Sequence, residues 1–186
     1  IDGLLSKKNS KEKYVDVYIP THGEISNNSH PFSIDDNGKG MNRDELENAL
    51  TAGMSGNDDS GQSLGLFGLG FNSASARLGD ELVVRTSRED MDHDLIVRVN
   101  LIELSAISRE DKTTRVIAEE VSKTFETSGT EIKISQFLPR SKKLLNRSTV
   151  ISYLNKAYSS LFLEKGKIKI TINGNDIKPY KFCIWN

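Results

Sequence analysis

Two glycine-rich segments contain the residues of this chain that are best suited to binding chemistry. In the first, Asp36 is followed by Asn37 and by glycines at positions 38 and 40. In the second, residues 65–71 carry three glycines and lead into a stretch typical of a helix. Glycine allows a backbone to approach a ligand closely, and a helix N-terminus attracts anions through its N–H groups and its dipole. An acidic acceptor combined with such a loop therefore indicates a nucleotide site.

Two familiar phosphate-binding patterns do not fit the chain. A P-loop requires Gly-Lys followed by Ser or Thr, and neither Gly-Lys pair, at 38–39 and 166–167, is followed in that way. The dinucleotide pattern requires a third glycine at the position where Ser73 stands. The two glycine segments must therefore belong to a different kind of nucleotide site.

Taken together, the two segments resemble motifs of the GHKL ATPase superfamily, which includes gyrase B subunits, heat-shock chaperones, histidine kinases and MutL proteins. Within it, the sequence FGLGFNSASARLGDELVVRTS at 67–87 is most similar to Microrchidia (MORC) ATPases and their bacterial relatives. Three motifs carry the resemblance: D-x-G-x-G at Asp36, Gly38 and Gly40; G-x-x-G-x-G at Gly65, Gly68 and Gly70; and Gly129-Thr130 at the start of a later strand.

The resemblance implies ATP and Mg²⁺ as cofactors and assigns roles to individual residues. Asp36 would accept a hydrogen bond from the adenine amino group, and Thr130 would contact adenine through water. The N–H groups of residues 67–71 would face the phosphates. The implied ATP-binding residues are Asp36, Gly38, Gly40, Met41, Gly65, Phe67, Gly68, Leu69, Gly70, Phe71 and Thr130.

Each of these residues also has a plain structural interpretation. Asp36 fits an ordinary Asp/Asn-Gly turn, and residues 65–70 could form a flexible linker. Met41 either packs near adenine or fills the core, as methionine often does. Thr130 could be a simple strand residue, because threonine favours strands.

The first motif of the superfamily places a catalytic Glu and a magnesium-binding Asn on one helix. Here Asp2 matches the last acidic residue of that motif, so the resemblance places the Glu and the Asn upstream of Ile1. We therefore expect no catalytic and no metal-binding residue within residues 1–186. The chain is expected to be one ATP-binding domain, truncated in its first catalytic helix and without downstream domains.

The resemblance implies Mg-ATP binding and slow hydrolysis, coupled to lid closure and to homodimerisation in the complete protein. DNA or protein clients would bind through domains outside this chain. Two alternatives stay open: a nucleotide-gated interaction module with little hydrolysis, and a histidine-kinase catalytic domain. The expected lid, residues 53–63, has no lysine, and Asn72 stands where Microrchidia-like proteins often have lysine. Both differences argue against fast turnover, and the missing lid lysine motivates the interaction module. The long tail after Thr130 argues against the kinase.

Composition limits the other classes of function. The 186 residues carry a net charge of −1, so no basic surface for nucleic acid is indicated. A single cysteine, Cys183, excludes an internal disulfide and favours a reducing, intracellular compartment. No apolar stretch reaches the length of a membrane span.

Strands mixed with helices, without strict alternation, predict an α+β fold with a two-layer sandwich. The resemblance implies the Bergerat type, with a mixed, largely antiparallel sheet. Asn42 and Glu45 predict a capping box that opens a helix containing Leu46 and Leu50. Residues 20–31 are expected to be a loop, and residues 114–120 a strand or a short helix. The other predicted helices are 69–78 and 148–162, and the predicted strands are 14–19, 32–34, 81–86, 95–101, 130–136, 167–172 and 177–182.

Overall fold

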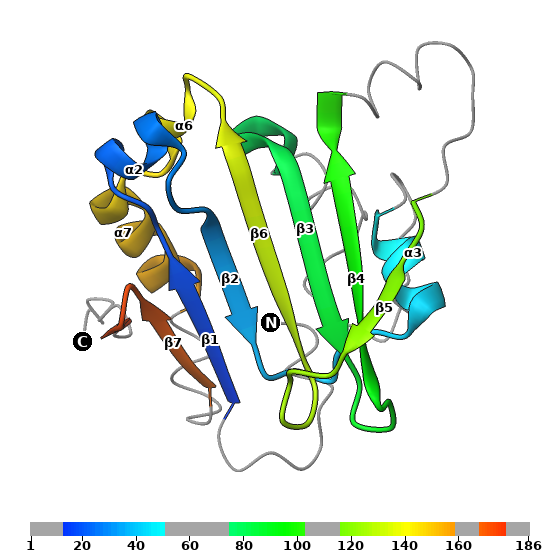
Figure 1. The fold of residues 1–186 in the computed structure, drawn as a ribbon. Coiled ribbons are helices and arrows are strands. Elements are labelled where there is room, and N and C mark those ends of the chain that lie inside the picture. The colour runs from blue at the N-terminus through cyan, green and yellow to red at the C-terminus, as the bar shows by residue number, and fades with distance from the viewer. Residues whose placement is uncertain (1–12, 51–74, 103–115, 159–167, 178–186) are drawn as a thin grey trace, which may run out of the picture.

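An eight-stranded mixed sheet organises the protein (Figure 1). The computed structural model describes residues 13–50, 75–102, 116–158 and 168–177. The strand order is β5-β4-β3-β6-β2-β1-β7-β8. β1 and β7 pair in parallel, and every other pairing in the described sheet is antiparallel. The strands are β1 (Lys13–Tyr18), β2 (Phe32–Asp36), β3 (Gly79–Ser87), β4 (His93–Asn100), β5 (Glu119–Ser122), β6 (Gly129–Phe137), β7 (Ile168–Ile172) and β8 (Asn175–Asp176).

The two sides of the sheet differ in chemistry because successive strand residues point to opposite sides. One side carries the buried Val17, Val84, Val97, Ile134 and Ile172, and we call it the apolar side. The register of β1, β2, β6 and β3 places four charged residues in one row on the other side, the charged side: Asp16, Asp35, Glu131 and Arg85.

Helices cover the apolar side, since their apolar residues belong to the same core cluster as the strands. Ile25, Leu46 and Leu50 are buried in that cluster. Figure 1 shows α7 near β1 and β7, α2 and α6 next to each other at the upper end of the sheet, and α3 near β4 and β5. The helices are α2 (His22–Asn27), α3 (Arg43–Leu50), α6 (Ser141–Leu144) and α7 (Arg147–Ala157). The predicted α+β two-layer sandwich is therefore confirmed.

The predicted loop at 20–31 is wrong, because α2 lies within it. Thr21 accepts a hydrogen bond from the Glu24 backbone N–H at 3.2 Å. The Glu24 carboxylate in turn accepts from the Thr21 N–H at 2.7 Å. This is a capping box, which satisfies N–H groups that lack partners at a helix start. Asn28 ends the helix in the left-handed conformation, with φ of 49°.

Three boundaries also differ from the prediction. β2 continues two residues past Ile34 and ends at Asp36. α7 begins at Arg147, one residue before the predicted start, because the Asn146 side chain caps it by accepting from the Thr149 N–H at 3.1 Å. The Asn-Gly pair at 173–174 forms a hairpin turn with positive φ angles, so that β8 is Asn175–Asp176; residues 178–182 of the predicted last strand lie outside the described residues.

The remaining element predictions have mixed outcomes. The capping box of α3 is confirmed, with Asn42 and Glu45 exchanging hydrogen bonds of 2.9 and 2.8 Å. β3, β4, β6 and β7 agree with the predicted strands within two residues. The open choice at 114–120 is decided in part, since Glu119 begins β5. The expected lid at 53–63 lies outside the described residues, and of the helix at 69–78 only 75–78 are described, as helical.

Candidate functional site

Three polar residues form a row across adjacent strands on the apolar side of the sheet. Thr130 in β6 lies directly opposite Asp36 in β2, and on its other side it lies opposite Thr86 in β3. Side chains of directly paired residues project from the same side of a sheet and are neighbours. The sheet therefore brings the acidic residue of the first motif beside the threonine of the Gly-Thr motif.

Asp36 is both the last residue of β2 and the first residue of a turn. Its Oδ1 accepts a hydrogen bond from the Gly38 N–H at 2.7 Å, the local pattern that Asp commonly forms in turns. Asn37 is also held, since its Oδ1 accepts from the Tyr14 N–H at 2.9 Å. The turn therefore has a defined conformation and brings the chain back toward β3.

Thr86 joins the turn to the Gly-Thr motif. It is completely buried. Its hydroxyl accepts from the Met41 N–H at 3.0 Å and donates to the Gly129 carbonyl oxygen at 2.9 Å. The Thr130 hydroxyl lies 3.1 Å away. Sequence reasoning missed Thr86. One signal was available: it continues the inward-facing positions of Leu82 and Val84, so it is a polar residue where an apolar one is expected.

Two glycines are required by close backbone packing at this junction. A Cβ at Gly129 would lie 2.3 Å from the Asp36 carbonyl oxygen, and a Cβ at Gly40 would lie 1.8 Å from the Ser87 carbonyl oxygen. Gly40 also has a φ of +68°, which glycine adopts at little cost. The motif glycine at 40 thus has a structural reason that does not depend on a ligand.

The β5–β6 connection at 123–128 supports the turn from the outside. Ser128 Oγ donates to the Gly38 carbonyl oxygen at 2.7 Å, in a buried contact. Asp94, completely buried, holds the start of this connection, because its Oδ2 accepts from the N–H and the hydroxyl of Thr124 at 2.9 and 2.8 Å. Arg85 Nε donates to the same oxygen at 2.8 Å.

The pKa of Asp94 reflects this set of partners. Burial alone would raise the pKa, but the hydrogen bonds from Thr124 and Arg85, with the Arg85 charge, outweigh burial and hold the pKa below its usual range. Asp94 therefore acts as a charged anchor. Its other oxygen, Oδ1, is buried without a hydrogen-bond partner among the described residues.

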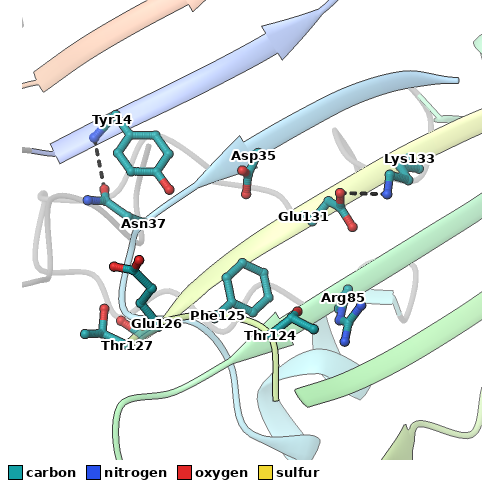
Figure 2. Close-up of a pocket in the computed structure, with 11 residues that line it drawn as sticks. Tyr14, Asp35, Asn37, Arg85, Thr124, Phe125, Glu126, Thr127, Glu131 and Lys133 are labelled. Atoms are coloured by element: carbon teal, nitrogen blue, oxygen red, sulfur yellow. Dashed lines mark hydrogen bonds and ion pairs between the residues drawn. The ribbon is translucent and has the colours of Figure 1, made fainter. Parts of the chain in front are cut away.

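A groove of about 540 Å³ lies on the charged side of the sheet (Figure 2). The strand register places Asp36 on the other side. Tyr14, Asp35, Glu131 and Lys133 line it together with the 124–128 connection. Burial, together with the charges of Glu131, Asp36 and Asp16, raises the pKa of Asp35 to about 6. Asp35 and Asp36 are thus neighbours in sequence but face different surroundings.

The structure brings together part of the predicted site. Asp36, Gly38, Gly40, Met41 and Thr130 gather around Thr86, as described above. Met41 packs partly against the core, and its contact with adenine stays a prediction. The predicted phosphate-loop residues lie outside the described part of the chain: Gly65, Phe67, Gly68, Leu69, Gly70 and Phe71.

Among the described residues, no group of three or more His, Cys, Asp or Glu side chains could hold a metal ion. Within the same ranges, no helix has both the length and the apolar character needed to cross a membrane.

Comparison with known proteins gives a family match and a fold match. Residues 8–133 match the model of a family described as histidine kinase-, DNA gyrase B- and HSP90-like ATPase. Two solved structures of the ATPase region of Saccharomyces cerevisiae topoisomerase II, one bound to ICRF-187 (dexrazoxane), are similar with a TM-score of 0.58 and 16% identity. The alignment covers 90% of this chain and 43% of theirs, so the chain spans less than half of their length. At this identity the likeness is one of fold. No curated protein matches.

Proposed function

The chain belongs to the histidine kinase-, DNA gyrase B- and HSP90-like ATPase family, and on that premise we propose that it binds ATP beside Asp36. One observation carries the proposal. Asp36 and Thr130 are 94 residues apart in the sequence, but they are direct partners across β2 and β6. This pairing brings two hydrogen-bonding side chains next to each other, which supports the contact with adenine that the family resemblance implies for both.

The chemistry of these side chains supports adenine as the base. A carboxylate only accepts hydrogen bonds, so Asp36 can accept from the amino group of adenine. It would repel the carbonyl oxygen that guanine carries at the same ring position. A hydrogen bond to a charged group is worth about 1.5–3 kcal/mol. ATP should therefore be bound in preference to GTP. Glycines 38 and 40 are both buried in the turn, which keeps the backbone close to the site.

The finer activity belongs to the same proposal. By resemblance, the protein binds Mg-ATP, hydrolyses it slowly, and couples lid closure to homodimerisation, and its residues 67–87 resemble those of Microrchidia-like ATPases. We assign magnesium binding to no described residue. An ATPase is supported over a histidine kinase by the continuation of the fold after Thr130, because β7 pairs in parallel with β1. The absence of lysine in residues 53–63 supports slow turnover.

The decisive experiment compares the ATP affinity of a variant at Asp36 with that of a variant at its neighbour Asp35. Asp36→Asn keeps the side-chain size, and its amide oxygen can still accept from the Gly38 N–H, so the turn should persist. ATP affinity measured by calorimetry on the protein with Mg²⁺ should fall by about tenfold or more, the value of a charge-assisted hydrogen bond. Asp35→Asn is the matched control, because Asp35 faces the groove on the charged side, and it should bind ATP like the parent.

Two results would contradict the proposal. One is an Asp36→Asn variant that folds and binds ATP with parental affinity. The other is equal weakening by Asp35→Asn and Asp36→Asn, which would indicate a general electrostatic effect rather than a contact with the base. Slow hydrolysis is tested separately by steady-state phosphate release from a protein that includes the catalytic Glu expected upstream of Ile1, where Asp36→Asn should raise the KM for ATP by about tenfold or more.

A further inference from the structure

The hydrogen bonds around Thr86 fix the direction of the Thr130 hydroxyl. A threonine hydroxyl has one proton to donate and can accept further hydrogen bonds. Thr86 uses its proton on the Gly129 carbonyl oxygen, 2.9 Å away, because a carbonyl can only accept. It also accepts from the Met41 N–H at 3.0 Å. The remaining 3.1 Å contact, between the two hydroxyls, is then a hydrogen bond only if Thr130 donates.

The Thr130 hydroxyl and the Asp36 carboxylate both act as acceptors toward a bound base. Once the Thr130 proton is committed to Thr86, the Thr130 hydroxyl can only accept from a ligand or from a bridging water. Asp36, its direct partner in β2, is a carboxylate and also only accepts. Both side chains are partly exposed, whereas Thr86 is completely buried. The row therefore presents two neighbouring acceptors and no donor.

We propose that Thr86 is a specificity-determining residue that acts through Thr130: by holding the Thr130 proton, it makes the site select a base edge that donates. This inference rests on the proposed function, and it adds a residue that touches no ligand. An adenine offers an amino group to the two acceptors. Hypoxanthine offers a carbonyl oxygen at the same position, which would face lone pairs only. Thr86 is thus a positioning residue for selectivity between amino and carbonyl purines.

The test compares ATP with inosine 5′-triphosphate, in which a carbonyl oxygen replaces the amino group and the adjacent ring nitrogen carries a proton. Thr86→Val removes the hydroxyl at nearly constant volume and frees the Thr130 proton to turn toward the ligand. The ratio of the inosine-triphosphate Kd to the ATP Kd should fall by about three- to tenfold, the value of one neutral hydrogen bond. Thr86→Ser retains the hydroxyl and should keep the parental ratio.

A double-mutant cycle separates selectivity from simple support of the fold. In a Thr130→Val background, Thr86→Val should leave the ratio unchanged, because no hydroxyl remains to be oriented. Thr130→Val alone should itself lower the ratio, and this measurement stands even if Thr86→Val does not fold. Equal weakening of both nucleotides by Thr86→Val, with the ratio unchanged, would overturn the inference and leave Thr86 a purely structural residue.

The Asp36 experiment keeps the two proposals apart. Should ATP affinity be insensitive to Asp36→Asn, the proposed function fails, and the inference fails with it. Should ATP affinity depend on Asp36 while both Thr86→Val and Thr130→Val keep the parental ratio, only the inference fails. Loss of selectivity in Thr86→Ser equal to that in Thr86→Val would likewise contradict it, because the serine hydroxyl can make the same hydrogen bonds.

Discussion

Gly129 lies so close to Asp36 that a Cβ on Gly129 would be 2.3 Å from the Asp36 carbonyl oxygen. Gly129 of the Gly-Thr motif therefore packs directly against the backbone of the D-x-G-x-G motif. Phe125 closes the same space, since its ring carbons would be 3.0 Å from that Cβ. Real Cβ atoms do not approach a backbone oxygen so closely, so a side chain here must push β2 and β6 apart.

Gly129→Ala should therefore lower the free energy of unfolding and weaken ATP binding together. Overpacking of this kind costs about 1–3 kcal/mol, measured by urea denaturation. Gly23→Ala is the control, because its Cβ would be 3.9 Å from the nearest atom and alanine favours the helix by up to about 1 kcal/mol. Parental stability in Gly129→Ala would show that the two strands can separate without cost.

Ser128→Ala tests whether the β5–β6 connection supports the turn. The Ser128 hydroxyl is the donor to the Gly38 carbonyl oxygen at 2.7 Å, and leaving a buried carbonyl without its donor costs about 1–3 kcal/mol. We expect weaker ATP binding, by about threefold or more, measured by calorimetry. Ser122→Ala is the matched control in the same part of the chain, because Ser122 is exposed. Equal affinities in both variants would exclude this support.

Asp94→Asn should destabilise the protein at neutral pH. Removing one partner of a buried ion pair costs about 3 kcal/mol, and the Asp94 side chain is 0% exposed beside Arg85. Asp90→Asn is the control, because its ion pair with Arg88 is exposed and such pairs contribute about 0–1 kcal/mol. Urea denaturation of the two variants at pH 7 gives the comparison, and equal stability would contradict an anchoring role for Asp94.

Asp94 should also make the stability of the fold depend on pH in the acidic range. The pKa of Asp94 is lower in the folded state than its usual value, so the unfolded chain takes up the proton first as the pH falls. The stabilisation is complete above about pH 4, the usual carboxyl range, and is lost as the pH falls through the folded-state pKa. The denaturation midpoint of the parent should therefore fall more steeply below pH 4 than that of Asp94→Asn.

Local patterns in the sequence were enough to predict most of the sheet. Strands β3, β4, β6 and β7 each combine apolar residues with β-branched side chains, and the capping box at Asn42 and Glu45 marks the start of α3. α2 was missed although Thr21 and Glu24 carry the same kind of signal, because the flanking prolines, asparagines and a glycine suggested a loop. β5 has little apolar pattern of its own. It is held by pairing with β4 and by Arg43, which donates to Glu120 at 2.8 Å.

In the candidate site, too, some residues could be predicted from local sequence patterns and others could not. Asp36 and Thr130 could be predicted because each stands in a recognisable motif. Thr86 stands out along the chain only as a polar residue at an inward-facing position of β3. Its role depends on the register between β3 and β6, and no spacing along the chain encodes that pairing. Residue 129 needs glycine for a related reason, since the backbone it meets belongs to a distant segment. Long-range strand register is thus the information that local sequence reasoning lacked.

Asp35 gives the last prediction, on the charged side of the sheet. Its pKa is raised to about 6 by burial and by the charges of Glu131, Asp36 and Asp16, against about 3.9 in an unfolded chain. Between these values the folded state holds the proton more tightly than the unfolded chain. Stability contributed by Asp35 is therefore greatest below about pH 4 and is lost as the pH rises through about 6.

Asp35→Asn removes this penalty. We expect the free energy of unfolding at pH 7.5 to rise by about 1 kcal/mol, a value reduced from the full shift because partial exposure screens the charges. The change with pH between 4 and 6 should also become flatter in the variant. Glu126→Gln is the control, because Glu126 lines the same groove but is exposed, and its denaturation curve should follow that of the parent. A lower stability of Asp35→Asn at pH 7.5 would show that the charged form of Asp35 is favoured in the fold, contrary to the repulsion inferred from Glu131 and Asp16.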